Sequence, residues 1–90
     1  MASSQFGGQD QAALDAAWLA LDALTDWAAP TIERALRSAL VDGLGLRPRD
    51  AYTPIRVAIT GRPISPPLFE LMAALGRDRS LARIRAAQQT

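Results

Sequence analysis

A proline-rich segment in the second half of the chain sets the strongest constraint on how the chain can fold. Residues 61–67 read Gly-Arg-Pro-Ile-Ser-Pro-Pro, with three prolines in five residues. Proline has no amide hydrogen and disfavours the helical conformation in the residue before it, so a helix cannot continue through this segment. We therefore expect a stiff, extended connector here, with a separate helix on each side of it.

On both sides of the connector, apolar residues recur at the three- and four-residue spacing of amphipathic helices. The pattern predicts five helices, over about residues 11–25, 30–41, 53–60, 67–75 and from 78 onwards. The residues expected to face inward are, helix by helix, Leu14, Ala17, Trp18, Leu21 and Leu24; Ile32, Leu36, Ala39 and Leu40; Ile55, Ala58 and Ile59; Leu68, Leu71, Met72 and Leu75; and Leu81 and Ile84. The predicted fold class is all-α, a compact bundle of about five short helices.

Glycine and aspartate mark where these helices should end and begin. Glycines at 43, 45, 61 and 76 follow apolar stripes, as expected of helix terminators. Asp10 and Asp78 are expected to cap the first and last helices. Proline is tolerated in a first helical turn, so Pro54 places the start of the third helix near Thr53. Residues 1–9 show no periodicity, and we expect an unstructured lead-in or an added tag before a domain of residues 10–90.

Several kinds of catalytic and metal site are excluded by composition. The 90-residue chain contains no cysteine and no histidine, which removes thiolate chemistry, imidazole acid–base catalysis and histidine-ligated zinc. Asp22 and Asp26 lie four residues apart, but a solvated helix face explains this pair better than a catalytic role does. Hydroxyl groups such as those of Thr60, Ser65 and Ser80 have no base to activate them. We predict that this chain has no catalytic residue, no metal site and no cofactor of its own.

No apolar run reaches the roughly 18–20 residues that a bilayer-spanning helix needs. Residues 1–10 lack the basic and apolar regions of a signal peptide. The expected location is therefore the cytoplasm, and no membrane partner is expected.

Charge is distributed unevenly along the chain. Residues 1–45 carry six acidic residues against two arginines, whereas residues 46–90 carry eight arginines against three acidic residues. All ten basic residues are arginine, which binds phosphate bidentately and stacks on bases. The basic half indicates a polyanionic partner, although a solvated basic face and a codon bias against lysine explain the same pattern.

Four of the aromatic residues are interpreted mainly as core residues. Trp18 lies on an apolar stripe, and Trp27 lies at a helix end, at the core edge or an interface. Tyr52 and Phe69 are likewise assigned to the core. Stacking of nucleic acid bases on these rings is the alternative.

A longer pattern gives the basic half a specific meaning. Residues 54–70 read Pro-Ile-Arg-Val-Ala-Ile-Thr-Gly-Arg-Pro-Ile-Ser-Pro-Pro-Leu-Phe-Glu, which strongly resembles a stretch near the end of bacterial glutamyl-tRNA synthetases. Residues 75–84, Leu-Gly-Arg-Asp-Arg-Ser-Leu-Ala-Arg-Ile, are similar to the closing motif of that family, and residues 45–52 to the approach before it. The resemblance covers about residues 43–86, and the residues before it fit the family only in being helical.

The resemblance implies a helical subdomain that contacts the first and middle anticodon bases of glutamate tRNA. It implies that Arg56 contacts an anticodon base or its phosphate, and that Ser65, Pro66 and Leu68 line the pocket for the bases. We add four arginines as candidates for contacts to the RNA backbone, namely Arg49, Arg62, Arg77 and Arg79. Thr60 is expected to be a helix-end residue and not a reader of bases.

The same resemblance bounds what the chain does alone. Its implied partners are glutamate tRNA and the remaining domains of the synthetase, and the chain is expected to be a monomer. The sequence motifs of the family's catalytic domain are absent, so the ATP and magnesium that such an enzyme uses are expected to bind elsewhere. The alternatives are a protein–protein docking domain, with the acidic first helices meeting the partner, and a free-standing relative with no role on tRNA.

Overall fold

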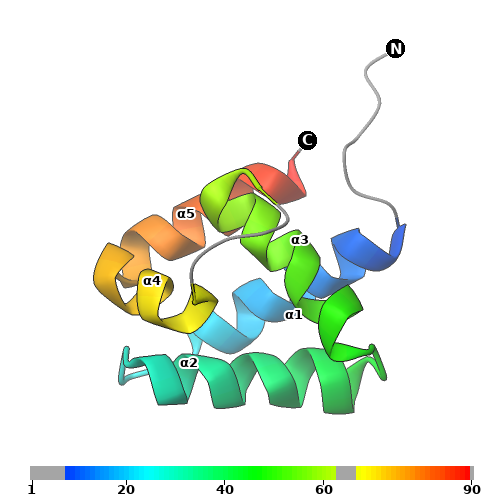
Figure 1. Ribbon diagram of the computed structural model, residues 1–90, viewed down its shortest axis with the longest axis horizontal. Helices are drawn as coiled ribbons and strands as arrows, with labels where there is room; N and C mark the ends of the chain where they lie inside the picture. Colours follow the sequence, from blue (N-terminus) through cyan, green and yellow to red (C-terminus); the bar gives the residue numbers. More distant parts are fainter. Residues whose placement is uncertain (1–7, 63–66, 90) are drawn as a thin grey trace.

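The computed structural model describes residues 8–62 and 67–89, and all regular structure within them is helical. The elements in chain order are α1 (Gly8–Asp22), α2 (Ala29–Leu36), η1 (Arg37–Gly43), α3 (Pro48–Thr60), α4 (Leu68–Leu75) and α5 (Arg77–Gln88). The element η1 is a stretch of π-helix that continues α2, so that α2 and η1 form a single rod (Figure 1). The predicted all-α fold with five helices is confirmed.

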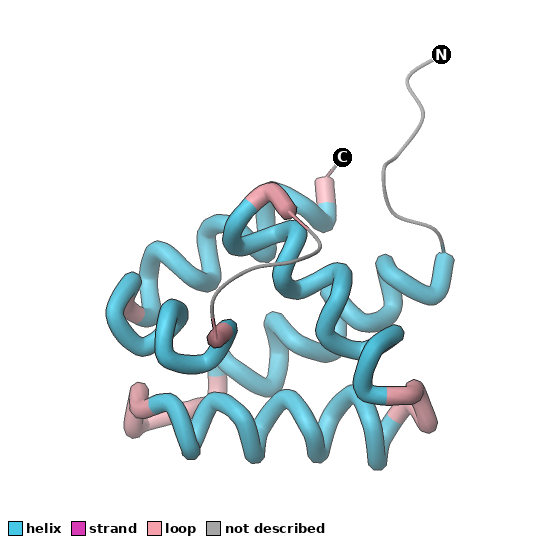
Figure 2. Tube along the Cα trace, viewed as in Figure 1, coloured by secondary structure: helices cyan, strands magenta, loops and turns pink. Residues whose placement is uncertain are grey.

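Helix α1 holds the bundle together because α3, α5 and the α2–η1 rod all pack against it. Figure 1 shows α1 and the rod running in opposite directions, as predicted for a helical hairpin. Helix α4 packs against α2 and α5, and α3 also contacts α5. Figure 2 shows that the described loops between these helices are short. No helix in the described part of the chain is long and apolar enough to cross a membrane.

The core is formed largely by the predicted apolar stripes. Most of the predicted inward-facing leucine, isoleucine and methionine side chains are buried, including Leu14, Leu21, Ile32, Leu36, Leu40, Ile55, Ile59, Leu68, Met72, Leu81 and Ile84. Trp18 and Trp27 are partly buried against this core, as are Tyr52 and Phe69. The Trp27 indole N–H donates a hydrogen bond of 2.9 Å to the Met72 carbonyl and so fixes α4 from the loop after α1. The core also includes Ala13, Ala51, Ser80 and Ala87, which the periodicity did not indicate.

The predicted aspartate caps are wrong at both ends of the chain. Helix α1 begins at Gly8, so Asp10 lies in its first turn, and the helix ends at Asp22 instead of residue 25. Helix α5 begins at Arg77 with Gly76 at the N-cap position, so Asp78 is its second residue. The Gly76 carbonyl accepts the Ser80 amide at 3.1 Å, which places the N-cap at Gly76 and the first helical residue at Arg77, one residue before Asp78. An acidic residue inside the first turn still interacts favourably with the helix dipole, and this explains why aspartate stands at both places.

The start of α3 also differs from the prediction. The helix begins at Pro48 instead of near Thr53, and Pro54 is an interior residue. Pro48 occupies the first turn, where proline is favoured. Pro54 has no amide hydrogen, so only the carbonyl of Asp50 loses its partner within the helix. Asp50 is an exposed residue, so water can bind to this carbonyl instead. The helix therefore tolerates a second proline and gains a buried ring in the core.

The glycine terminators at 61 and 76 are confirmed, and Gly45 follows the end of η1 with a φ of 71°, whereas Gly43 is the last residue of η1 and does not stop the helix before it. Gly61 ends α3 with a φ of 81° and donates its amide to the Val57 carbonyl at 2.8 Å. Gly76 separates α4 from α5 with a φ of 97°. Both angles lie in the region that favours glycine over residues with a side chain. The predicted stiff connector lies largely outside the described residues, in 63–66.

We predict that Leu14→Ala lowers the free energy of unfolding by about 2–5 kcal/mol, because it deletes a fully buried side chain and leaves a cavity. Leu19→Ala on the same helix removes a side chain that is 68% exposed, and it should change the free energy of unfolding by less than about 0.5 kcal/mol. Urea denaturation followed by circular dichroism measures both values. Equal effects of the two substitutions would contradict the assigned inner and outer faces of α1.

Candidate nucleic-acid interface

A hollow lies on the outer surface of α3 and contains two of the predicted RNA-binding arginines. Five residues line it, which we call the α3 strip: Pro48, Arg49, Tyr52, Thr53 and Arg56. Consecutive members of the strip are one, three, one and three positions apart in sequence. This spacing places them along one face of an α-helix. The hollow has a volume of about 340 Å³, within the range of small-ligand pockets.

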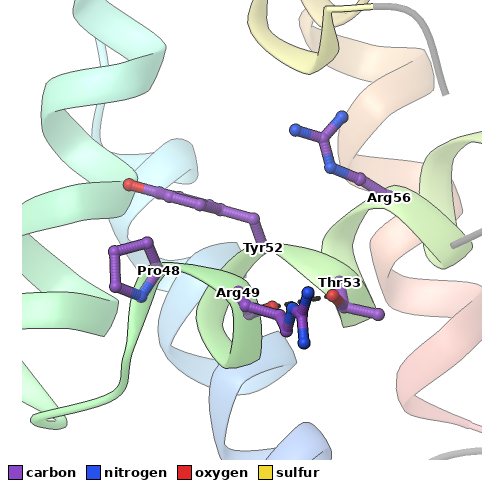
Figure 3. A pocket seen from close by; sticks show the side chains of 5 residues that line it. All are labelled: Pro48, Arg49, Tyr52, Thr53 and Arg56. Carbon is purple, nitrogen blue, oxygen red and sulfur yellow. Dashed lines mark hydrogen bonds between the residues drawn. The ribbon is translucent and has the colours of Figure 1, made fainter. Parts of the chain in front are cut away.

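Two arginines and an aromatic ring line this hollow. Figure 3 shows the Tyr52 ring extending from α3 toward the α2–η1 rod, with Pro48 near it and Arg49 and Arg56 at different places along α3. Arg49 is exposed and Arg56 is half-buried. The Thr53 hydroxyl donates to the Arg49 carbonyl at 2.7 Å and so adds a side-chain bond to the first turns of the helix. A ring with arginines beside it offers a stacking surface for a base and cations for its phosphates.

The Tyr52 ring is held in place by neighbours on other helices. Its centroid lies 5.4 Å from that of Phe69 in an edge-to-face arrangement, which joins the α3 strip to the first turn of α4. Figure 3 shows the hydroxyl pointing toward the α2–η1 rod. Burial raises the pKa of this hydroxyl above its ordinary 10.0, Arg37 lowers the pKa, and Glu33 and Asp42 raise it. The ring is thus fixed before any ligand arrives.

The other predicted arginines lie apart from the strip. Arg62 is exposed just after α3, and its backbone amide donates to the Thr60 hydroxyl at 3.1 Å. The same hydroxyl donates to the Arg56 carbonyl at 2.7 Å, which supports the prediction that Thr60 is a helix-end residue. Arg79 is exposed on α5. Arg77 is half-buried and is engaged by α1, since it bonds the Asp22 carbonyl at 2.6 Å and the Asp22 carboxylate at 3.1 Å.

One predicted site residue requires correction. Leu68 was expected to line the base pocket, but its side chain is only 1% exposed and belongs to the core. The first residue of α4 points inward because the stripe that it begins, continued by Met72, packs into the bundle. Only the Leu68 backbone remains a candidate for contact with RNA. Ser65 and Pro66 lie outside the described residues.

The acidic pair at Asp22 and Asp26 has separate structural roles. Asp22 ends α1 and bonds Arg77, whereas the Asp26 carboxylate accepts the Thr31 hydroxyl at 2.7 Å. Because α1 ends at Asp22, the two residues do not share a helix face. Within residues 8–62 and 67–89, no group of three potential metal ligands comes together.

Pro48 and Thr53 were not among the predicted site residues, and Tyr52 was predicted as a core residue with base stacking as the alternative. The signal was present, because these residues and the two arginines form one helical face once α3 starts at Pro48. Because the start of α3 was predicted near Thr53, the residues before it were assigned to a turn and those after it to a helix. The aromatic member was assigned to the core, where half of it does lie.

Comparisons with known proteins identify what the chain is similar to. Residues 3–88 match the family model described as an anticodon binding domain. The chain is 62% identical over 88 residues to a glutamate–tRNA ligase of Mycolicibacterium paratuberculosis, covering 98% of the chain and 18% of that protein. It is 57% identical over 88 residues to the ligase of Mycobacterium tuberculosis, again over 98% and 18%, and 67% identical over 81 residues to that of Acidothermus cellulolyticus, over 89% and 16%. The similarity thus reaches well before residue 43, where the sequence motifs begin, and the chain spans less than a fifth of each relative.

We predict that Tyr52 titrates with a pKa above 10.0 in the folded chain and near that value in urea. As the only tyrosine, it can be followed by near-ultraviolet absorbance without interference from another tyrosine. Arg37→Ala should raise the folded pKa further, and Glu33→Gln should lower it. The folded chain holds this proton more tightly than the unfolded chain does. The resulting stability is therefore fully present below pH 10.0 and is lost as the pH rises through the folded pKa. A folded-state midpoint at or below 10.0 would refute the partly buried placement of the hydroxyl.

Proposed function

Because this chain belongs to the family of anticodon binding domains, we propose that it binds the anticodon loop of glutamate tRNA as part of a glutamate–tRNA ligase. In this role it contacts the first and middle anticodon bases and contributes to the choice of tRNA. The observation that supports the proposal best is the α3 strip, because it combines a fixed aromatic ring with two arginines in a nucleotide-sized hollow.

The residues of the strip have different roles in the proposal. Arg56 makes the contact to an anticodon base or its phosphate, since its half-buried side chain lines the same hollow as the Tyr52 ring (Figure 3). Tyr52 offers its ring to a base of the loop, because single-stranded RNA is commonly bound by stacking on aromatic side chains. Arg49 is exposed and contacts the phosphate backbone of the RNA. Its charge matters more in this contact than its exact position.

The remaining candidates extend this surface. Arg62 and Arg79 are exposed arginines for phosphates, and Ser65 and Pro66 stand between α3 and α4 in sequence. Arg77 is the weakest of the candidates, because phosphate would have to compete with two bonds to Asp22. Leu68 contributes through its backbone amide at the start of α4, where helix N–H groups favour anions.

The chemistry of the ligase belongs to the remainder of the protein in this proposal. The chain spans 18% of the first relatives, so the sites for ATP, magnesium and glutamate have ample room elsewhere. The partners of the domain are glutamate tRNA and the other domains of the ligase. Affinity in isolation should be weak, because most contacts of the complete enzyme with tRNA lie outside this chain, and sensitive to salt, because arginines meet phosphates.

We predict that the chain binds a glutamate anticodon stem-loop more tightly than stem-loops altered at the first or middle anticodon position. Arg56→Ala should weaken binding to the glutamate stem-loop by about 1–3 kcal/mol and relax the preference at those positions. Arg49→Ala should weaken binding to all stem-loops alike and reduce the slope of log affinity against log salt by about 1. Fluorescence anisotropy over a series of salt concentrations measures both quantities.

Arg34→Ala serves as the matched control for the strip variants. It removes the same charge from an exposed position on α2 that is not part of the strip, so it should leave the preference unchanged. Equal binding of all stem-loops by the wild-type chain and by Arg56→Ala would refute the proposal. In that case, a protein partner whose capture depends on α1 would favour the docking alternative.

A further inference from the structure

Three arginines of α5 are used to hold other helices. Arg77 bonds the carbonyl of Asp22 at the last residue of α1, at 2.6 Å. Arg85 places its guanidinium 4.2 Å from the centroid of the Trp18 ring, also on α1. Arg83 donates to the carbonyl of Ile59 in the last turn of α3, at 2.6 Å. Arg83 and Arg85 are exposed and Arg77 is half-buried, but each is engaged by another helix, so their charge alone does not make them RNA contacts.

The Arg83 contact satisfies a group that the helix itself leaves unpaired. The last four carbonyls of an α-helix have no amide partner within the helix, and Ile59 is one residue before the end of α3. The contact is partly buried, which makes an unpaired carbonyl there costly. A guanidinium at this end also interacts favourably with the negative end of the helix dipole.

Other contacts fix the same helix end. The Gly61 amide closes the final turn on the Val57 carbonyl, and the Thr60 hydroxyl bonds the Arg56 carbonyl and the Arg62 amide. All of these contacts lie within α3 or just after it, whereas Arg83 is 24 residues away in sequence and belongs to α5. Arg83 therefore adds a hydrogen bond from another helix to the end of α3, beside the packing of the buried Ile59 side chain.

Arg56 is affected by this bond because it lies three residues before Ile59, on the same final turns of α3. Fraying of those turns would let the Arg56 backbone sample several positions. Each additional position has to be given up on binding, which lowers affinity without removing any contact to RNA. A binding residue held by its supporting contacts avoids this loss.

We infer that Arg83 is a positioning residue for anticodon recognition, acting through its bond to the Ile59 carbonyl on the last turn of α3 that follows Arg56. The inference rests on the proposed function, since it concerns how the same site is held. Arg83 itself does not contact RNA. Its effect is therefore on discrimination between anticodons and not on the number of phosphate contacts.

The test compares Arg83→Met with Arg79→Met in the full chain. Both substitutions remove one exposed guanidinium from α5 and keep an apolar stem, but Arg83 bonds the Ile59 carbonyl, whereas Arg79 lies one helical turn earlier on α5. Anisotropy titrations give the ratio of affinities for the glutamate stem-loop and for stem-loops altered at the first two anticodon positions, together with the salt slope. Circular dichroism confirms that each variant is folded at the temperature used, and all variants are titrated at a lower temperature if Arg83→Met is unfolded there.

We expect Arg83→Met to reduce the discrimination ratio on the order of tenfold, with the salt slope unchanged. Arg79→Met should keep the ratio and lose at most the salt-sensitive part of the affinity. Arg83→Lys, which retains a donor, should restore part of the discrimination. Amide exchange at Gly61 should become faster in Arg83→Met and not in Arg79→Met.

Two results would overturn the inference while the proposed function stands. One is a wild-type chain and an Arg83→Met variant that discriminate equally. The other is a salt slope that falls by about one in Arg83→Met, which would make Arg83 a direct phosphate contact. If the wild-type chain itself does not discriminate between anticodons, the proposed function is overturned instead. That result does not depend on any variant, so the two failures can be told apart.

Discussion

The carbonyl groups at the ends of short helices are the constraint on which this structure depends. Helix α4 has eight residues, so the groups without a partner inside the helix form a large share of its backbone. Other elements supply donors where helices end, through Arg77 for α1 and Arg83 for α3, and the Trp27 indole adds a second donor to the Met72 carbonyl, which also accepts the Gly76 amide. These bonds also set how the helices lie relative to one another, which a small apolar core alone specifies less sharply.

This requirement divides the arginines into two groups. Those on α5 are mainly occupied with α1 and α3, whereas Arg49 and Arg56 on α3 border an open hollow. The basic character of the second half of the chain therefore has two physical causes. The second group lines a surface hollow, and it does so on a helix whose last turn Arg83 of the first group bonds.

The sequence was sufficient for the apolar faces and for the helix ends marked by Gly61 and Gly76, because both depend on residues close together in the chain. It was insufficient for the start of α3, since Pro48 and Pro54 each satisfy the rule for a first turn and only tertiary packing decides between them. The inward position of Leu68 follows from its stripe, but the resemblance to a family drew attention to its sequence position and away from its burial. Contacts such as Arg83 with Ile59 join residues 24 positions apart, and no local pattern reports them.

The chemical nature of the acceptors in these tying contacts has a consequence for sequence change. Ile59 and Met72 accept through main-chain oxygens, atoms that every amino acid possesses. Replacing either residue alters packing but retains the acceptor, whereas replacing Arg83 or Trp27 removes a donor that few other side chains can supply. Tolerance to mutation should therefore be asymmetric across each contact. The architecture is encoded mostly by the donating residues, and the accepting positions are free to vary as far as the core allows.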